Sequence, residues 1–199
     1  MKKNLLLFSI FMSIALSDSG QAVSFYKENL VMKLDASHMI VTGEYCFRNN
    51  YSTDANQTVY FPLPLANADL KLDSISVFNE SDQTYIRHMR KLPAGLFFQM
   101  VFHGQEQIKL RIYYVMDHNG KNFCYPVMTN IEYWKKPLSQ GTYTLHVEDP
   151  SIIIDSTSYK PDEVIADNSK VTHTWRKMNF KPDKELDIWF HKKNSEIAK

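Results

Sequence analysis

The stretch VYFPLPLANADLKLDSISVF, residues 59–78, places two prolines one residue apart inside an apolar run and then continues as a second strand-like segment. Pro62 and Pro64 have no backbone N–H to donate, and each restricts the preceding residue to extended geometry. Prolines of this kind are tolerated only at a strand end or on a sheet edge. The pattern therefore predicts that one strand stops here, at an edge, while its apolar side chains still reach a core.

The apolar phase changes downstream of the prolines. Apolar side chains occupy even positions at Leu70 and Leu72 and odd positions at Ile75 and Val77. A strand can change phase only through a β-bulge or by crossing from one sheet to another. We expect such a bulge or crossing near Asp73–Ser74, which makes this stretch the corner of a sandwich.

The rest of the chain also shows a period of two, which is typical of half-buried strands. Short strands at this spacing, with no helix of ten or more residues, predict an all-β fold, an antiparallel β-sandwich of immunoglobulin-like or related type. A few helical residues are expected only in PDEVIADN (161–168), and turns at sites such as Gln140–Gly141. The predicted inward sets are Leu30, Met32 and Leu34; Ile108, Leu110, Ile112 and Tyr114; Tyr143, Leu145 and Val147; and Leu186, Ile188 and Phe190.

The N-terminus has the order of a secretory signal peptide: two lysines, an apolar run over 5–16, and then small polar residues. Cleavage is expected after Ser17 or after Ala22, and Ala22 is preferred. No cysteine follows the run, so we expect no lipid anchor and a secreted or periplasmic protein without a transmembrane segment after cleavage. The predicted organisation is a signal peptide over 1–22, two packed β parts over 23–117 and 118–193, and a flexible tail over 194–199.

The charge balance argues against nucleic acid as a partner. The whole chain has 23 lysines and arginines against 22 acidic residues, and removal of the signal peptide takes away two lysines. A nearly neutral domain has no long-range field to attract nucleic acid or acidic lipid.

The only two cysteines are Cys46 and Cys124. In an oxidising compartment an even pair is most simply a disulfide. In both local patterns the cysteine alternates with bulky apolar residues, which predicts that each thiol lies outside the main core. The two thiols could form a disulfide there if their Cα atoms approach within about 7 Å. Unpaired thiols and a catalytic cysteine remain open alternatives.

Several segments of the first half resemble a known family. GEYCFRN (43–49), VYFPLP (59–64), DSISV (73–77) and LRIYY (110–114) resemble the N-terminal part of the vault and inter-alpha-trypsin domain. With IEYWKKPL (131–138) and FKPD (180–183), the chain also looks like a group of secreted bacterial proteins of unknown function. The resemblance implies an extracytoplasmic β-sandwich involved in interactions, and it brings no catalytic residues with it.

The sequence contains no recognisable catalytic motif. There is no glycine-rich phosphate loop and no G-x-S-x-G, so we expect no cofactor. The seven histidines are scattered without metal-ligand spacing, so we expect no metal site. His173 alternates in phase with Trp175 and is interpreted as a core histidine with satisfied hydrogen bonds. If two carboxylates catalysed hydrolysis, Glu44, Asp73 and Asp117 would be the residues to inspect.

A cluster of aromatic and basic residues is the best candidate for binding. Tyr133, Trp134, Lys135 and Lys136 precede a turn, and a solvent-facing Tyr–Trp pair is a common anchor for a protein or a sugar. The alternative is that Trp134 fills one end of the core. We therefore favour a non-catalytic interaction or structural module of the cell envelope that binds an extracellular protein or glycan. The alternative is a small secreted hydrolase acting on polysaccharide or peptide.

Overall fold

The structure is a computed structural model that describes residues 22–62, 71–92, 95–118, 121–126, 136–167 and 170–193. Within these ranges every regular element is a β-strand, which confirms the all-β class, and no helix there is long and apolar enough to cross a membrane. The predicted tail, and the predicted signal peptide except for Ala22, lie outside the described residues. The strands are β1 (Val23–Leu34), β2 (His38–Asn49), β3 (Ala55–Pro62), β4 (Lys71–Asn79), β5 (Thr84–Tyr85), β6 (Met89–Leu92), β7 (Gly95–Phe102), β8 (Gln107–Asp117), β9 (Phe123–Cys124), β10 (Leu138–Val147), β11 (Ile152–Thr157), β12 (Glu163–Ala166), β13 (Val171–Phe180) and β14 (Ile188–Lys192).

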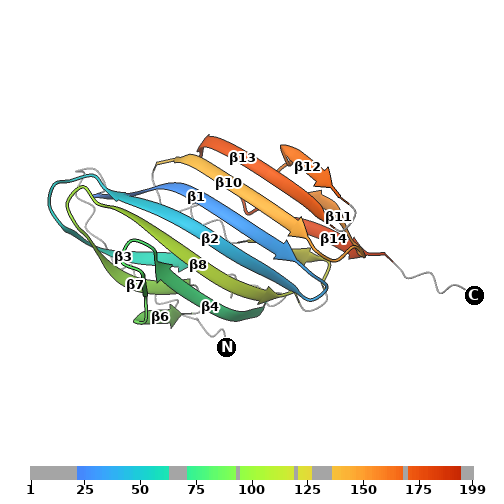
Figure 1. Ribbon diagram of the computed structural model, residues 1–199, viewed down its shortest axis with the longest axis horizontal. Helices are drawn as coiled ribbons and strands as arrows, with labels where there is room; N and C mark the ends of the chain where they lie inside the picture. Colours follow the sequence, from blue (N-terminus) through green and yellow to red (C-terminus); the bar gives the residue numbers. More distant parts are fainter. Residues whose placement is uncertain are drawn as a thin grey trace, which may run out of the picture.

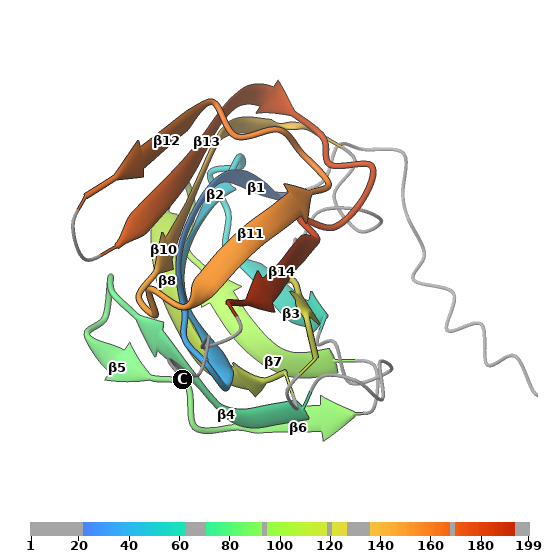
Figure 2. The same ribbon diagram turned by 90° about the vertical axis from the view of Figure 1, so that its right-hand side faces the viewer.

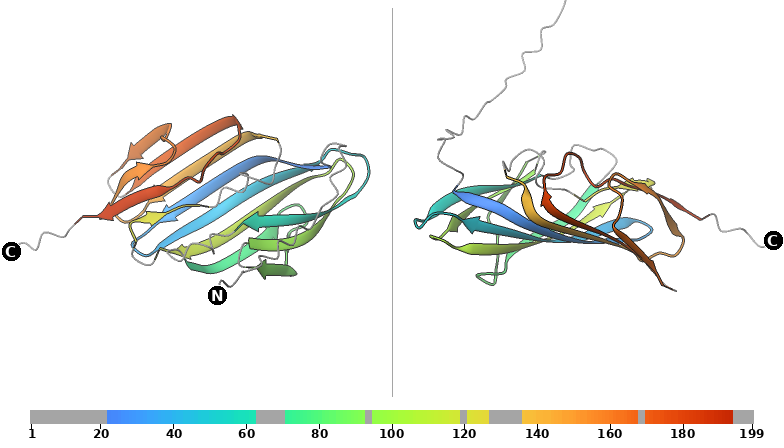
Figure 3. Two further views of the ribbon diagram at one scale, coloured as in Figure 1. Left: turned by 180° about the vertical axis from the view of Figure 1, so that it is seen from behind. Right: turned by 90° about the horizontal axis from the view of Figure 1, so that it is seen from above.

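The strands form three sheets in two layers. The first layer is an eight-stranded sheet in the order β12-β13-β10-β1-β2-β8-β4-β5, which faces the viewer in Figure 1. The second layer consists of two three-stranded sheets, β11-β14-β9 and β3-β7-β6. The large sheet is curved, and β11, β14, β3 and β7 lie inside its curve (Figures 2 and 3). The predicted β-sandwich is therefore confirmed, with one of its layers divided in two.

One strand pair in the large sheet is parallel. β1 and β10 run side by side in the same direction, with Leu30 opposite Tyr143, whereas β1 pairs with β2 in the antiparallel sense. The sequence predicts antiparallel pairing only. Because of the β1–β10 pair, strands from 23–117 and from 118–193 share one continuous sheet, and the division into two packed β parts stays a prediction.

The core lies between the two layers. All the predicted inward sets are buried, with Leu30, Leu110 and Leu145 fully so. Aromatic rings join the layers: the Phe61 ring of β3 lies edge-on to Tyr45 of β2 and to Tyr114 of β8, with centroids 5.6 and 5.9 Å away.

The corner predicted from the two prolines is also found. β3 ends at Pro62 and is an edge strand of its sheet, as a residue without an N–H donor requires. When the chain is next described, at Lys71, it has crossed to the large sheet. The register of β4 against β8 shifts between Leu72 and Ser74, which confirms a bulge at Asp73. Pro64 lies outside the described residues.

Two local predictions are wrong. PDEVIADN contains no helix in its described part, because its β-branched Val164 and Ile165 pair with β13 as strand β12. Gln140–Gly141 is not a turn but lies inside β10. Gly141 is needed there because a Cβ would come within 2.7 Å of the hydroxyl oxygen of Tyr143, whose side chain folds back along the same face.

Candidate functional site

The predicted binding patch falls almost entirely outside the described residues. Tyr133, Trp134 and Lys135 are not described, and Lys136, just before β10, is exposed. Whether Trp134 serves as an anchor or fills the core therefore stays a prediction.

The predicted disulfide is not present. Cys46 and Cys124 are free thiols, and the two side chains face different environments. Cys46 lies on the outer face of the large sheet, between Lys27 of β1 and Lys109 of β8 in the register, as the alternation predicts. Cys124 is fully buried, opposite Ile188 of β14, so the phase predicted for its strand is wrong.

Burial raises the pKa of both thiols. For Cys124 burial is the single cause, and for Cys46 it outweighs the opposing effect of Lys27 and Lys109. A raised pKa reduces the thiolate fraction, which is the nucleophilic form. The electrostatics therefore favour unreactive structural cysteines over a catalytic one.

The reversed phase at β9 exposes an aromatic cluster, which we define as Phe123, Tyr125 and Trp189. The Phe123 ring lies 5.4 Å from the Trp189 ring and 5.7 Å from the Tyr125 ring, centroid to centroid. Trp189 is 39% exposed, and the other two rings are partly buried. Three partly exposed rings in mutual contact, with the two contacting pairs tilted by 41° and 47°, offer an apolar contact area that loses little entropy on binding.

Alternation along β14 places Trp189 in this cluster. Ile188 and Phe190 point into the core and are essentially fully buried, so Trp189 and His191 point outward on the same face. β14 pairs with Phe123 of β9 on one side and with β11 on the other. The cluster therefore lies on the outer face of the sheet β11-β14-β9.

Polar groups flank the aromatic cluster on this face. Ser156 of β11 lies opposite Trp189, and two residues further along β14 the Nδ1 of His191 contacts the Asp155 carboxylate at 2.6 Å. A register shift between Ile154 and Ser156 creates a bulge at Asp155. A bulge can redirect a side chain from its regular position, and here the outcome is an imidazole–carboxylate pair beside an aromatic surface.

Sequence reasoning found part of this site. The alternation around Trp189, between Asp187 and His191 on the polar face, predicts an outward tryptophan and is confirmed. The alternation around Cys124 predicts that Phe123 and Tyr125 point inward; instead Cys124 is buried, Phe123 is half-buried, and Tyr125 is half-buried with part of its surface against the core. The missing information was the partner strand: β9 is short, and only its pairing with β14 fixes which face is buried.

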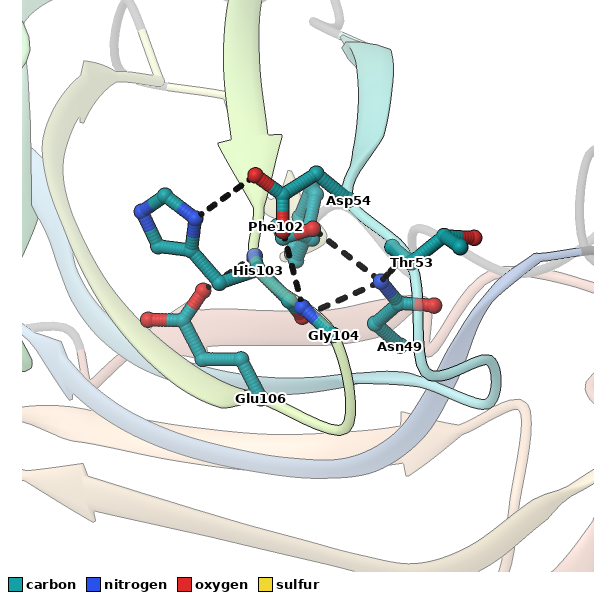
Figure 4. A network of polar contacts seen from close by, with 7 residues as sticks. All are labelled: Asn49, Thr53, Asp54, Phe102, His103, Gly104 and Glu106. Carbon is teal, nitrogen blue, oxygen red and sulfur yellow. Dashed lines mark hydrogen bonds and ion pairs between the residues drawn. The ribbon is translucent and has the colours of Figure 1, made fainter.

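A second polar cluster joins the two loops beside β3 and β7 (Figure 4). Asp54 contacts His103 Nδ1 at 3.1 Å and accepts a hydrogen bond from the backbone N–H of Gly104. Glu106 accepts one from the backbone N–H of His103. The bond with Asp54 raises the pKa of His103, and the reciprocal bond lowers the pKa of Asp54.

Asn49 anchors these loops. Its buried side-chain amide donates to the backbone carbonyls of Thr53, Phe102 and His103 at 2.8 to 3.0 Å, and its carbonyl accepts from the N–H of Tyr51. One side chain thus pairs backbone groups of both loops, which explains why a polar residue is buried at the end of β2.

The three candidate carboxylates do not form one site. Asp117 lies opposite His38 and Lys71 in the register, and Asp73 approaches His38 Nε2 at 3.6 Å, so these two lie at the same end of the sheet. Glu44 instead pairs with Arg111. His38, His103 and His191 each face an aspartate with both side chains substantially exposed.

Glu28 and His173 are two of the polar residues that are buried. Glu28 is fully buried and accepts a hydrogen bond from the Tyr143 hydroxyl at 2.9 Å. His173 is buried, as predicted, and its ring stacks on that of Trp175. Its Nδ1 has no hydrogen-bond partner among the described residues, so the expectation of a fully satisfied histidine is wrong. Burial lowers the pKa of His173, which keeps the ring neutral at physiological pH.

Comparison with known proteins informs the fold. No family model and no curated protein matches the chain. Among solved structures it is similar to a candidate nutrient-binding protein from Legionella pneumophila, with a TM-score of 0.69, 8% identity, and coverage of 85% of this chain and 67% of that one. It is also similar to an M1 zinc metallopeptidase from Deinococcus radiodurans, with a TM-score of 0.47 and 9% identity. The match covers 85% of this chain and spans only 43% of the peptidase chain. At 8% identity, the similarity to the Legionella protein establishes a shared fold and nothing beyond it.

Proposed function

We propose that this chain is a non-catalytic binding module that works in the secreted or periplasmic space. The observation that carries the proposal is the aromatic cluster of Phe123, Tyr125 and Trp189, whose rings contact one another and are partly exposed. The N-terminal signal-like segment supports the location, and the name of the Legionella protein, which refers to nutrient binding, agrees with a binding role.

The surroundings of the cluster favour a glycan over an apolar protein surface. A sugar ring presents a face of C–H groups that stacks on an aromatic ring, and a rim of hydroxyls that needs hydrogen-bond partners. Ser156, His191 and Asp155 supply donors and acceptors next to Trp189. Binding sites of this type combine aromatic walls with a few well-placed polar groups.

Co-sedimentation with insoluble polysaccharides tests the proposal. We expect the chain to sediment with at least one of peptidoglycan, chitin and cellulose, and Trp189→Ala to lower the affinity about tenfold, as loss of a central aromatic anchor does. Tyr113→Ala is a matched control, because Tyr113 is also 39% exposed but lies on the large sheet. If the chain sediments with none of the three polysaccharides, or if Trp189→Ala and Tyr113→Ala lower the affinity equally, the proposal is contradicted.

A second candidate, a hydrolase of polysaccharide or peptide, is favoured by the imidazole–carboxylate pairs at the surface, of which His103–Asp54 is tested first. His103 and Asp54 form an imidazole–carboxylate pair of the kind that serves general acid–base catalysis. The test is hydrolysis of the same polysaccharides and of casein by the chain and by His103→Ala. Activity that this substitution abolishes would replace the binding proposal.

A further inference from the structure

The outermost strand of the large sheet has an open edge. β12 ends the order β12-β13-β10-β1-β2-β8-β4-β5, and it pairs with β13 on one side only, within the part of the chain that the structure describes. In Figure 2 the β12–β13 hairpin lies at the periphery of the molecule. An open edge of this kind is a template for one more strand.

The hydrogen-bond pattern identifies the backbone groups that point outward. Asp167 donates its N–H to Lys170, which closes the β12–β13 hairpin. In an antiparallel ladder bonded and non-bonded pairs alternate, so Ile165 bonds to Thr172 of β13, and at the other end of β12 the carbonyl of Thr174 accepts the N–H of Asp162. Val164 and Ala166 then direct their N–H and C=O groups away from the sheet.

The side chains of Val164, Ile165 and Ala166 in β12 are apolar and exposed on both faces. Val164, opposite His173, is 53% exposed, and Ile165, opposite Thr172, is 55% exposed. Protein edge strands are normally blunted by charge, proline or a cover. Here Pro161 limits the edge at one end, and the centre stays apolar and accessible.

Acidic residues flank this apolar centre. Glu163 and Asp167 lie at its two ends, and Asp162 precedes it. Arg176 pairs with Glu163, and Lys177 with Asp162, but both cations belong to β13, one strand further from an incoming chain. The charge nearest to an added strand is therefore negative at both ends.

We propose that β12 binds an extended peptide segment, added as a ninth strand, that has a β-branched apolar centre and a lysine or arginine at each end. The outward backbone groups of Val164 and Ala166 would bond to it, and its apolar side chains would cover Val164 and Ile165. Main-chain bonds supply affinity, and the flanking charges supply selectivity.

The same charges disfavour a second copy of the chain. A two-fold antiparallel pair that uses Val164 and Ala166 sets Val164 opposite Ala166 of the copy. Glu163 of each copy then faces Asp167 of the other copy. Like charges directly opposite each other destabilise a strand pair.

Fluorescence anisotropy with two labelled peptides tests the inference on the full chain. The probes are acetyl-KVTVTVK-amide and acetyl-EVTVTVE-amide, which differ only in end charge. We expect the lysine peptide to bind at least tenfold tighter. Val164→Pro removes an outward N–H without removing a bond to β13, and we expect this variant to bind the lysine peptide about tenfold more weakly. Val164→Thr keeps the N–H and should keep the affinity. Asp167→Lys should reduce the ratio of the affinities for the two peptides, because it replaces a negative charge with a positive one at one end of the apolar centre.

A chemical control covers the case in which Val164→Pro unfolds, as judged by circular dichroism. N-methylation of the three valines, which occupy alternate positions of the lysine peptide, removes the N–H donors along one edge of the peptide. We expect this modification to abolish binding to the unmodified chain. Equal affinity for both peptides, no binding, or indifference to N-methylation would overturn the inference, as would a dimer that Val164→Pro dissociates. Trp189→Ala should leave peptide binding unchanged, so this result and the glycan result are independent.

Discussion

The hydroxyl of Tyr143 on β10 donates a hydrogen bond of 2.9 Å to the fully buried carboxyl group of Glu28 on β1. Burial first, and the nearby Glu28 second, raise the pKa of Tyr143, so the phenol stays protonated and able to donate. The bond links the two strands of the only parallel pair among the described strands of the large sheet. It therefore lies where the two halves of the sequence join.

We expect Tyr143→Phe to destabilise the fold. The substitution keeps the ring and removes one donor to a buried carboxyl group, a change that costs roughly 1.5–3 kcal/mol. Urea unfolding followed by circular dichroism measures it. Tyr113→Phe, at a half-exposed position, serves as the control and should change stability by less than about 0.5 kcal/mol. Equal effects of the two substitutions would show that the bond to Glu28 contributes nothing.

Gly43 makes room for Tyr45 on the inner face of β2. A Cβ at position 43 would lie 2.5 Å from the Tyr45 hydroxyl oxygen and against its ring. Gly43→Ala should therefore cost roughly 1–3 kcal/mol by overpacking. In a Tyr45→Leu background the same change should cost much less, and a double-mutant cycle measures this coupling. Additive costs would contradict the close packing of the two residues.

The cysteines should be free and differ in reactivity. Cys46 is partly accessible and Cys124 is fully buried with a raised pKa. We expect iodoacetamide to label Cys46 slowly in the native chain and Cys124 only after denaturation, with peptide mass spectrometry as the readout. Reductant should leave the mass of the unlabelled chain unchanged. A mass increase on reduction would restore the predicted disulfide.

The His103–Asp54 pair should make the loops sensitive to pH. The bond with Asp54 raises the pKa of His103 above its ordinary value. The stabilisation is thus complete below the unfolded-state pKa near 6.5 and disappears as pH rises through the folded-state value. NMR titration should show a raised His103 pKa that returns to the ordinary range in Asp54→Asn. An unchanged pKa in that variant would contradict the assignment.

The local pattern predicted the features that depend on one strand alone. Pro62 ends β3 because a missing N–H is a property of the residue, and the bulge at Asp73 follows from a visible change of phase. The outward position of Trp189 is of the same kind, since Ile188 and Phe190 leave no doubt about the buried face.

Features that depend on a partner strand escaped prediction. The parallel β1–β10 pair joins residues more than a hundred positions apart, and no local signal encodes it. Around β9 the bulky Phe123 and Tyr125 are the residues that the sequence predicts to be buried. Pairing with β14 instead buries Cys124 and places Phe123 on the outer face. The error about the disulfide and the failure to foresee the aromatic cluster thus have one cause.

The most direct test of the binding proposal is a titration observed at the tryptophan indole N–H groups. In an NMR spectrum of the ¹⁵N-labelled chain, soluble fragments of the polysaccharide that co-sediments should shift the Trp189 signal, assigned through Trp189→Phe. The Trp175 indole is buried and donates to the Tyr159 carbonyl at 2.8 Å, so its signal should not move. A titration that moves only the Trp134 signal, or none, would contradict the aromatic cluster as the binding surface.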